Sequence, residues 1–141
     1  MSAPRRPVVV GYDGSEESRS ALLWALRDTA PDGTVVPVAV LGHEPSPVPG
    51  VSLVPGVPDE RARVARRIAG AWDADGADLR DVAELRFEHG HPASVLAAVA
   101  ASEDAEMIVV GHHRGRRLAA LRPSVAEDLL REAHCPVVVV P

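Results

Sequence analysis

The sequence contains no lysine, since all fifteen of its basic residues are arginine. This absence excludes the protein classes whose chemistry depends on a lysine side chain, namely Walker-type P-loop nucleotidases, Schiff-base enzymes and receiver-domain phosphoacceptors. The single cysteine, Cys135, excludes an internal disulfide and a metal site built from several cysteines. No G-x-S-x-G segment occurs, so the chain also lacks the nucleophile of an α/β-hydrolase.

Long apolar runs and a basic charge balance are missing as well. No run approaches the roughly eighteen residues of a membrane-spanning helix, and the amino terminus lacks the layout of a signal peptide. We therefore expect a cytoplasmic protein with no membrane partner. The formal net charge of -5 argues against a nucleic-acid partner. Aromatic residues make up 3% of the chain but hydrophobic residues 46%, which predicts one domain over residues 1–141 with a core of Val, Leu, Ile and Ala.

Short apolar segments alternate with helical patterns along the whole chain. Strands are expected within 7–11, 34–42, 81–90, 106–111 and 136–141, and helices within 15–30, 59–76, 91–105 and 123–135. This alternation predicts an α/β fold with a parallel sheet and helices on both of its faces.

Several local features refine this prediction. Ser15 is the expected N-cap of the first helix. Pro37 is awkward in a central strand and favours a bulge or a position near an edge. Residues 43–58 are rich in proline and glycine, and so long a connection is usually functional or mobile. Residues 81–90 alternate apolar and polar side chains, which predicts an edge strand with one exposed side.

Polar chemistry follows two of the strands. Asp13 comes after the first strand and Gly111 ends the fourth, and ligands of open parallel sheets bind beyond such carboxyl ends. If the two strands are neighbours, Asp13 faces the loop after Gly111 and the start of the helix at Ser124. A helix N-terminus suits phosphate, whereas a carboxylate opposite it suits a ribose hydroxyl or a metal ion that bridges phosphates. The loop itself carries four arginines: Arg114, Arg116, Arg117 and Arg122.

Three segments of the chain carry a resemblance to a known protein family. They are "VVVGYDGSEESRSALLWA", "HGHPASVLAAVAASEDAEMIVVGHHRG" and "PSVAEDLLREAHCPVVVV". Through them it resembles the universal stress proteins almost from end to end. The resemblance implies a flavodoxin-like (Rossmann-like) three-layer sandwich with five parallel strands. It also implies a homodimer, and it places the uncharged strand 137–140 at the sheet edge, where antiparallel pairing across a two-fold axis is the simplest closed solution.

Many members of this family bind ATP through a loop of pattern G-x2-G-x9-G-[ST], and this chain departs from that pattern. Gly111 matches the first glycine and Ser124 the hydroxyl residue that contacts phosphate. Arg114 stands where the second glycine should fall, and Gly115 comes one place late. Pro123 replaces the third glycine in a loop one residue shorter, so one N–H donor is lost. The arginines could supply charge-assisted contacts in its place. The loop is a degenerate nucleotide cradle.

The same resemblance implies the remaining contacts. Asp13 would meet the nucleotide near its ribose, and the main chain near Val40 would border the adenine. The expected ligand is ATP or AMP, with Mg²⁺. Plain capping remains the alternative for Asp13 and for Ser124. The predicted nucleotide-binding residues are Gly11, Asp13, Gly14, Val40, Gly111, Arg114, Gly115, Ser124 and Val125.

Three functions remain open. The first is an adenine-nucleotide-binding module of the stress response. The second is a dimeric interaction protein of the same fold whose phosphate loop has closed. The third is an enzyme, at most one that hydrolyses ATP slowly, with no general base beyond Asp13, His112 or His113.

Neither the histidines nor the cysteine indicate a metal site. His112 and His113 are adjacent and diverge on an extended backbone, so they do not easily share an ion. His89 and His91 flank a glycine at a strand end and are expected to be structural. Cys135 is expected to be a small buried hydrophobe.

Overall fold

The computed structural model describes residues 5–29, 33–42, 60–76, 84–112 and 125–141. Strands and helices alternate along them as the sequence predicts. The elements are β1 (Val8–Gly11), α1 (Glu16–Thr29), β2 (Val35–Leu41), α2 (Glu60–Gly76), β3 (Arg86–His89), α3 (Pro92–Ser102), β4 (Met107–Gly111), α4 (Val125–Glu132) and β5 (Val137–Val140). The proline- and glycine-rich segment 43–58 lies outside the described residues.

The strands form one five-stranded parallel sheet in the order β3-β2-β1-β4-β5. This confirms the predicted fold class. The central strand β1 pairs with β2 on one side and with β4 on the other. The two edges are β3, as the alternating pattern of 81–90 predicts, and β5, as the family resemblance implies.

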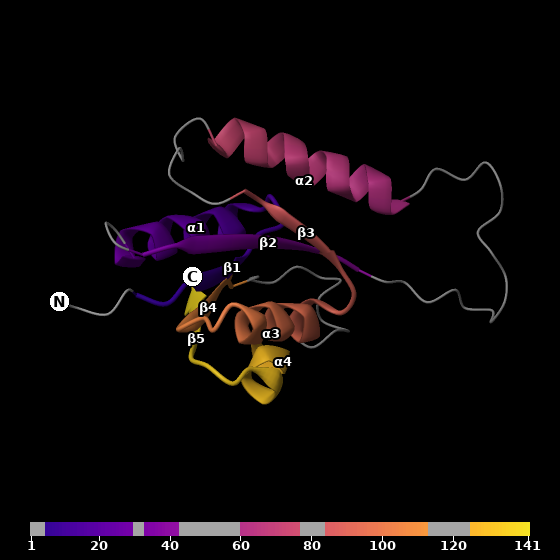
Figure 1. Cartoon of the computed structure of the whole chain (residues 1–141). Helices are drawn as coiled ribbons and strands as arrows, with labels where there is room; N and C mark the ends of the chain where they lie inside the picture. Colours follow the sequence, from indigo (N-terminus) through magenta and orange to yellow (C-terminus); the bar gives the residue numbers. More distant parts are fainter. Residues whose placement is uncertain (1–4, 30–32, 43–59, 77–83, 113–124) are drawn as a thin grey trace, which may run out of the picture.

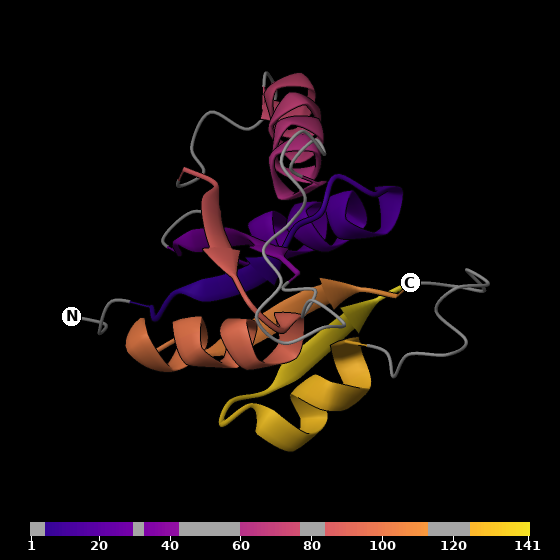
Figure 2. The ribbon, with the colours of Figure 1, turned by 90° about the vertical axis from the view of Figure 1, so that its right-hand side faces the viewer.

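Helices cover both faces of the sheet (Figures 1 and 2). α1 and α2 lie on one face, and α3 and α4 lie on the other. The side chains of β1 alternate between the two layers, since Val8 and Val10 pack with α1 and α2 whereas Val9 packs with α3 and α4. All three valines are fully buried. An uninterrupted apolar run is therefore what a central strand of this sheet requires.

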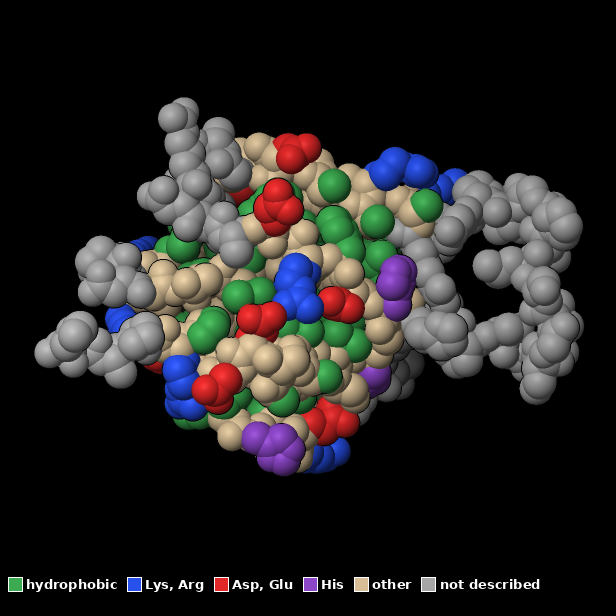
Figure 3. All heavy atoms as spheres, in the orientation of Figure 1, with side chains coloured by type: hydrophobic (Ala, Val, Ile, Leu, Met, Phe, Trp, Pro, Cys, Tyr) green, Lys and Arg blue, Asp and Glu red, His purple; other side chains and the backbone are tan. Residues whose placement is uncertain are grey.

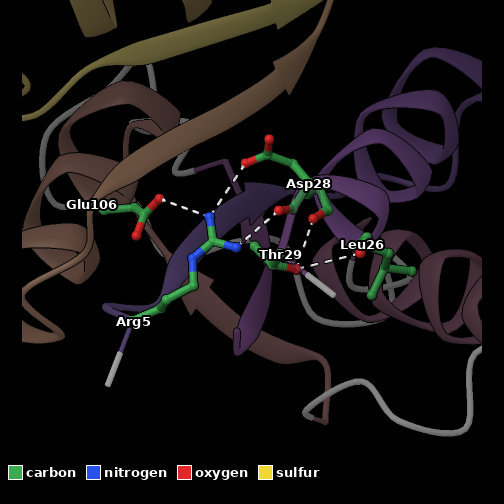
Figure 4. Close-up of polar contacts among 6 residues, drawn as sticks. Arg5, Leu26, Asp28, Thr29 and Glu106 are labelled. Carbon is green, nitrogen blue, oxygen red and sulfur yellow. Dashed lines mark hydrogen bonds and ion pairs between the residues drawn. The ribbon is translucent and has the colours of Figure 1, made fainter. Parts of the chain in front are cut away.

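Arg5, just before β1, joins the amino ends of the sheet to α1 (Figure 4). Its Nη1 donates a hydrogen bond of 3.1 Å to the main-chain oxygen of Asp28, and its Nη2 lies 3.5 Å from Oε1 of Glu106. The buried hydroxyl of Thr29 donates to the carbonyl of Ala25 at 2.7 Å, so it leaves no unsatisfied donor inside the protein. These contacts fix the end of the sheet opposite the carboxyl ends of the strands.

Pro37 lies in β2, one strand from the edge, and is fully buried. The carbonyl of Val38 accepts a hydrogen bond from the N–H of Tyr12 on the β1 side. Main-chain groups of successive residues point to opposite sides of a strand, so the nitrogen of Pro37 faces β3. Because β3 begins to pair only at Val38, the missing N–H of Pro37 costs the sheet no hydrogen bond.

The two sides of β3 are less distinct than the sequence pattern predicts. Phe87 is 38% exposed, whereas the polar residues Arg86 and Glu88 are half-buried. Arg86 explains the difference, because its guanidinium lies 2.9 Å from Oε1 of Glu103 and 3.2 Å from Oε1 of Glu88. These ion pairs hold the polar side of the strand against the end of α3, while Phe87 lies at the margin of the opposite layer.

Candidate functional site

The strand order brings Asp13 and Gly111 to the same edge of the sheet. The chain builds β1, β2 and β3 in one direction from the centre and then returns to place β4 and β5 on the other side of β1. The point between β1 and β4 is therefore the topological switch point, where α/β sheets bind ligands. Val10 pairs with Val109, so the turn after β1 and the end of β4 are adjacent.

Asp13 stands in a closed turn between β1 and α1. Its Oδ1 accepts a hydrogen bond of 2.9 Å from the N–H of Ser15, and its own N–H donates to Oγ of Ser18 at 3.2 Å. The predicted N-cap is confirmed, because Oγ of Ser15 accepts the N–H of Ser18 at 3.1 Å and its carbonyl accepts the N–H of Arg19. Asp13 thus closes the turn that precedes the helix, and its side chain is exposed.

The two glycines beside Asp13 have structural reasons of their own. Gly14 has φ +84°, a conformation that a residue with a side chain rarely adopts. An added Cβ at Gly14 would lie 3.1 Å from Cβ of Ala71 on α2. At Gly11 it would lie 3.2 Å from Leu96 and 3.3 Å from Val110. Both glycines therefore allow close packing, and Gly14 also allows the turn.

Gly111 is required by the packing of α1 on β4. An added Cβ there would collide with the main-chain carbonyl of Glu17, in the first turn of α1. The Oε2 atom of Glu17 is also buried, and no hydrogen-bond partner reaches it from the part of the chain that the structure describes. A buried anionic acceptor of this kind favours a donor or a cation beside it.

The other predicted residues are placed only in part. Val40 is half-buried in β2, two residues beyond Val38, which pairs with Gly11, so it lies level with the Asp13 turn. Val125 is half-buried and begins α4. Several residues of the predicted phosphate loop lie outside the described residues, namely His113, Arg114, Gly115, Arg116, Arg117, Arg122, Pro123 and Ser124.

Sequence reasoning misses the contribution of α2 to this turn. The hydroxyl of Tyr12 donates a hydrogen bond of 2.7 Å to Oδ2 of Asp75, and the ring of Tyr12 meets Trp72 edge to face at 5.2 Å. Nε of Arg19 lies 3.4 Å from Oδ1 of the same aspartate. Burial, together with the bonded and negatively charged Asp75, raises the pKa of the Tyr12 phenol well above its usual value. Partners 63 positions apart leave no periodic signal in the sequence.

α2 also carries positive charge. Figure 3 shows basic side chains at the end of the molecule where α2 begins, and the exposed arginines of that part of the helix are Arg63, Arg66 and Arg67. Acidic side chains are spread over the rest of the same face. Basic charge is therefore not confined to the loop that follows Gly111.

His91 links α3 to α4, which fits the structural role expected of it. Its Nε2 lies 3.7 Å from Oδ2 of Asp128, and its Nδ1 lies 3.5 Å from Oγ of Ser94. Asp128, His91 and Ser94 follow one another in the order of the acid, base and nucleophile of a catalytic triad. The hydroxyl of Ser94, however, also lies 3.0 Å from the carboxylate of Glu132. A proton committed to that carboxylate is not available to His91, so the arrangement is an exposed polar contact between two helices.

Cys135 is half-buried, and burial raises the pKa of its thiol. It lines a hollow of about 170 Å³ together with Arg6, Asp104 and His134. Within the described ranges, no cluster of three His, Cys, Asp or Glu side chains could hold a metal ion. None of the helices described is long and apolar enough to cross a membrane.

Comparisons with known proteins agree with this architecture. A sequence profile of the universal stress protein family matches residues 4–141. A universal stress protein of Mycobacterium tuberculosis is 36% identical over 149 residues, which cover 99% of this chain and 50% of that protein. Another from the same organism is 33% identical and is covered over 46% of its length. The chain thus spans about half the length of the curated relatives it matches.

Solved structures of similar proteins share the fold. A universal stress family protein of Burkholderia pseudomallei has a TM-score of 0.72 at 28% identity, and the match covers 100% of this chain and 99% of that one. A universal stress protein solved in complex with cAMP has a TM-score of 0.63 at 22% identity, over 98% of each chain. The sequence profile, the relatives and the strand order agree, and the chain belongs to the universal stress protein family.

Proposed function

We propose that this chain binds an adenine nucleotide, ATP or AMP, as a cytoplasmic module of the stress response. The observation that carries the proposal is the position of β1 beside β4 at the switch point, which brings the Asp13 turn next to Gly111. The family structure that contains cAMP supports the ligand class. We propose binding without catalysis, at most slow hydrolysis of ATP.

The described residues suit different parts of such a ligand. The exposed carboxylate of Asp13 suits the ribose hydroxyls, and the main chain near Val40 suits the adenine edge, level with that carboxylate. Gly11 and Gly14 keep the turn free of side chains around it. The start of α4 at Val125 offers N–H groups to phosphate, to which Arg114, Gly115 and Ser124 would add.

Magnesium suits the same turn, because carboxylate oxygens are its preferred protein ligands. The buried Oε2 of Glu17, which no hydrogen-bond partner among residues 5–29, 33–42, 60–76, 84–112 and 125–141 reaches, fits a cation better than it fits a phosphate. We propose that Glu17 would hold the ion through its carboxylate, while the carboxylate of Asp13 serves the ribose. A bound magnesium ion would neutralise phosphate charge next to these acidic side chains.

One observation favours the alternative of an interaction protein without a nucleotide. The first turn of α4 carries Glu127 and Asp128, and their negative charge opposes phosphate at that helix end. The substitution of Pro123 for a glycine and the displaced Gly115 also disfavour the binding of phosphate by this loop. If they close the site, the family fold serves protein partners alone.

Titration calorimetry with ATP and AMP in the presence of magnesium tests the proposal. We expect submillimolar binding that weakens in Asp13→Ala and in Ser124→Ala. Asp73→Asn is the matched control, because it removes one exposed carboxylate from α2 and leaves the turn intact. No heat at millimolar nucleotide, with no nucleotide released from the purified protein on denaturation, would refute binding and favour the interaction protein.

We also propose a homodimer through β5, residues 137–140. This strand is a sheet edge, and Val139 is 40% exposed on it. Unpaired main-chain groups on an apolar edge favour pairing with a second copy across a two-fold axis. Analytical ultracentrifugation should give a dimer at micromolar concentration and a shift toward monomer in Val139→Arg. A wild-type monomer under these conditions would contradict this assembly.

A further inference from the structure

The residues on both sides of Asp13 are held by α2. Tyr12 bonds to Asp75 through its hydroxyl and packs against Trp72 through its ring. Gly14 lies against the methyl group of Ala71. Asp13, between them, bonds to Ser15 and Ser18 at the start of α1. The turn is therefore clamped between two helices, and Figure 1 shows α2 lying over α1 on this face of the sheet.

Asp75 is the centre of this clamp. One carboxylate oxygen accepts the hydrogen bond of Tyr12 at 2.7 Å, and the other lies 3.4 Å from the guanidinium of Arg19. A single side chain of α2 thus contacts the residue before Asp13 and a residue in the second turn of α1. The phenol is only 2% exposed and Asp75 only 18%, so water competes little for either bond.

The geometry separates this clamp from the binding surface. Tyr12 is buried in the core, where its ring cannot meet a ligand, whereas the side chain of Asp13 is exposed. The Asp75–Tyr12 bond therefore acts on ligand only through the backbone that carries Asp13. A carboxylate whose backbone is held in a fixed position can accept hydrogen bonds from a pair of ribose hydroxyls. Because the turn is already ordered before the ligand binds, less conformational entropy is lost on binding.

We infer that Asp75 is a positioning residue that sets the preference of the site for a ribose with free hydroxyls, acting through Tyr12 on Asp13. This inference rests on the proposed nucleotide function and adds a residue of α2 to it. It predicts that loss of the clamp weakens recognition of the sugar while leaving the contacts to base and phosphate in place.

The test compares ATP with 2′,3′-dideoxy-ATP, each with magnesium, by calorimetry on the full chain. The wild-type protein should bind ATP at least about tenfold more tightly, as hydrogen bonds to a charged acceptor imply. Asp75→Asn and Tyr12→Phe should reduce that ratio to within about threefold, and the affinity for the dideoxy compound should stay within about twofold of wild type. A general loss of structure would instead lower both affinities together.

Asp73→Asn is the matched control, since it removes the same charge two positions away on an exposed part of α2. Circular dichroism checks that each variant folds. If Asp75→Asn does not fold, Tyr12→Phe alone tests the inference. Wild-type discrimination that persists in both folded variants overturns the inference alone, as does a wild type that binds both compounds equally. A wild type that binds neither compound overturns the proposed function and the inference with it.

Discussion

Tyr12 should remain un-ionised far above the pH at which an ordinary tyrosine titrates. It is the only tyrosine of the chain, its side chain is buried, and its hydroxyl donates to the carboxylate of Asp75. The burial and the hydrogen bond to Asp75 both favour the neutral phenol. Because burial and the charge of Asp75 raise the pKa in the folded protein, the unfolded chain releases the phenolic proton first, near pH 10.

The sign and size of the effect follow from this difference. The contribution of Tyr12 to stability is fully present below about pH 10 and is lost as the pH rises from there toward the raised pKa of the folded state. In that window the free energy of unfolding should fall by about 1.4 kcal/mol for each pH unit. At pH 11.5 the loss reaches about 2 kcal/mol, a sizeable part of the 5–15 kcal/mol that typically stabilises a domain.

The composition makes this slope unusually easy to assign. Lysine, which would titrate in the same range, is absent, and arginine stays charged to higher pH. Cys135 acts in the same direction, because burial raises the pKa of its thiol as well. A Cys135→Ala background removes that contribution. Urea unfolding between pH 9 and 11.5, with the absorbance of tyrosinate followed in parallel, would therefore report on Tyr12.

The matched comparison is Tyr12→Phe in the same background. This variant should lose roughly 1.5–3 kcal/mol at pH 8, the usual size of a hydrogen bond to a charged group, but its stability should then be nearly flat up to pH 11.5. The reasoning would be refuted by tyrosinate absorbance that appears near pH 10 while circular dichroism still shows the native fold. An alkaline slope that survives in Tyr12→Phe would refute it equally.

Three further predictions concern packing and helix ends, all measured by urea unfolding. Gly111→Ala should lower the free energy of unfolding by about 2 kcal/mol or more, because the new methyl group meets the main chain of Glu17. Gly42→Ala is the control and should stay within about 0.5 kcal/mol of wild type, because nothing lies near its added Cβ. Equal losses in the two variants would contradict the close approach of α1 to β4. Gly70→Ala, in open space on α2, should stabilise by about 0.5–1 kcal/mol, and a loss would mean that α2 is not helical there. Ser15→Ala should cost about 1 kcal/mol, and no change would argue against its capping bond to Ser18.

The sequence predicts the sheet well because burial leaves a clear pattern in short strands. Val8, Val9 and Val10 are consecutive because helices cover both faces of β1, and the apolar runs of β1 and β4 end at Gly11 and Gly111. The alternation around Phe87 correctly predicts an edge strand. It does not predict which side is exposed, because Arg86 finds acidic partners on the side that the pattern assigns to solvent.

The candidate site is predictable only where its signals are local. Asp13 and Gly14 lie in a turn whose residue types indicate its shape, and Ser15 indicates the start of a helix. The clamp on that turn depends on Asp75, which reaches Tyr12 only after the chain has folded. Gly111 illustrates a different limit. The loop motif predicts a glycine there because a phosphate must come close to the backbone, whereas the structure adds a second reason, the close packing of Glu17 on this residue.

The central place of β1 also has a consequence for synthesis of the chain. Among the five strands of this sheet, β1 is made before the others and must wait for β4, because Val8 pairs with Met107, about a hundred residues later. At the usual 5–20 residues per second this leaves the β4 side of β1 unpaired for roughly 5 to 20 seconds after its synthesis. During that interval β1, β2 and β3 can form only three of the five strands of the sheet, with an open and fully apolar edge at Val8–Val10. A ribosome that stalls before residue 107 would thus hold a nascent chain that exposes, as an unpaired strand edge, the apolar segment that later occupies the middle of the sheet.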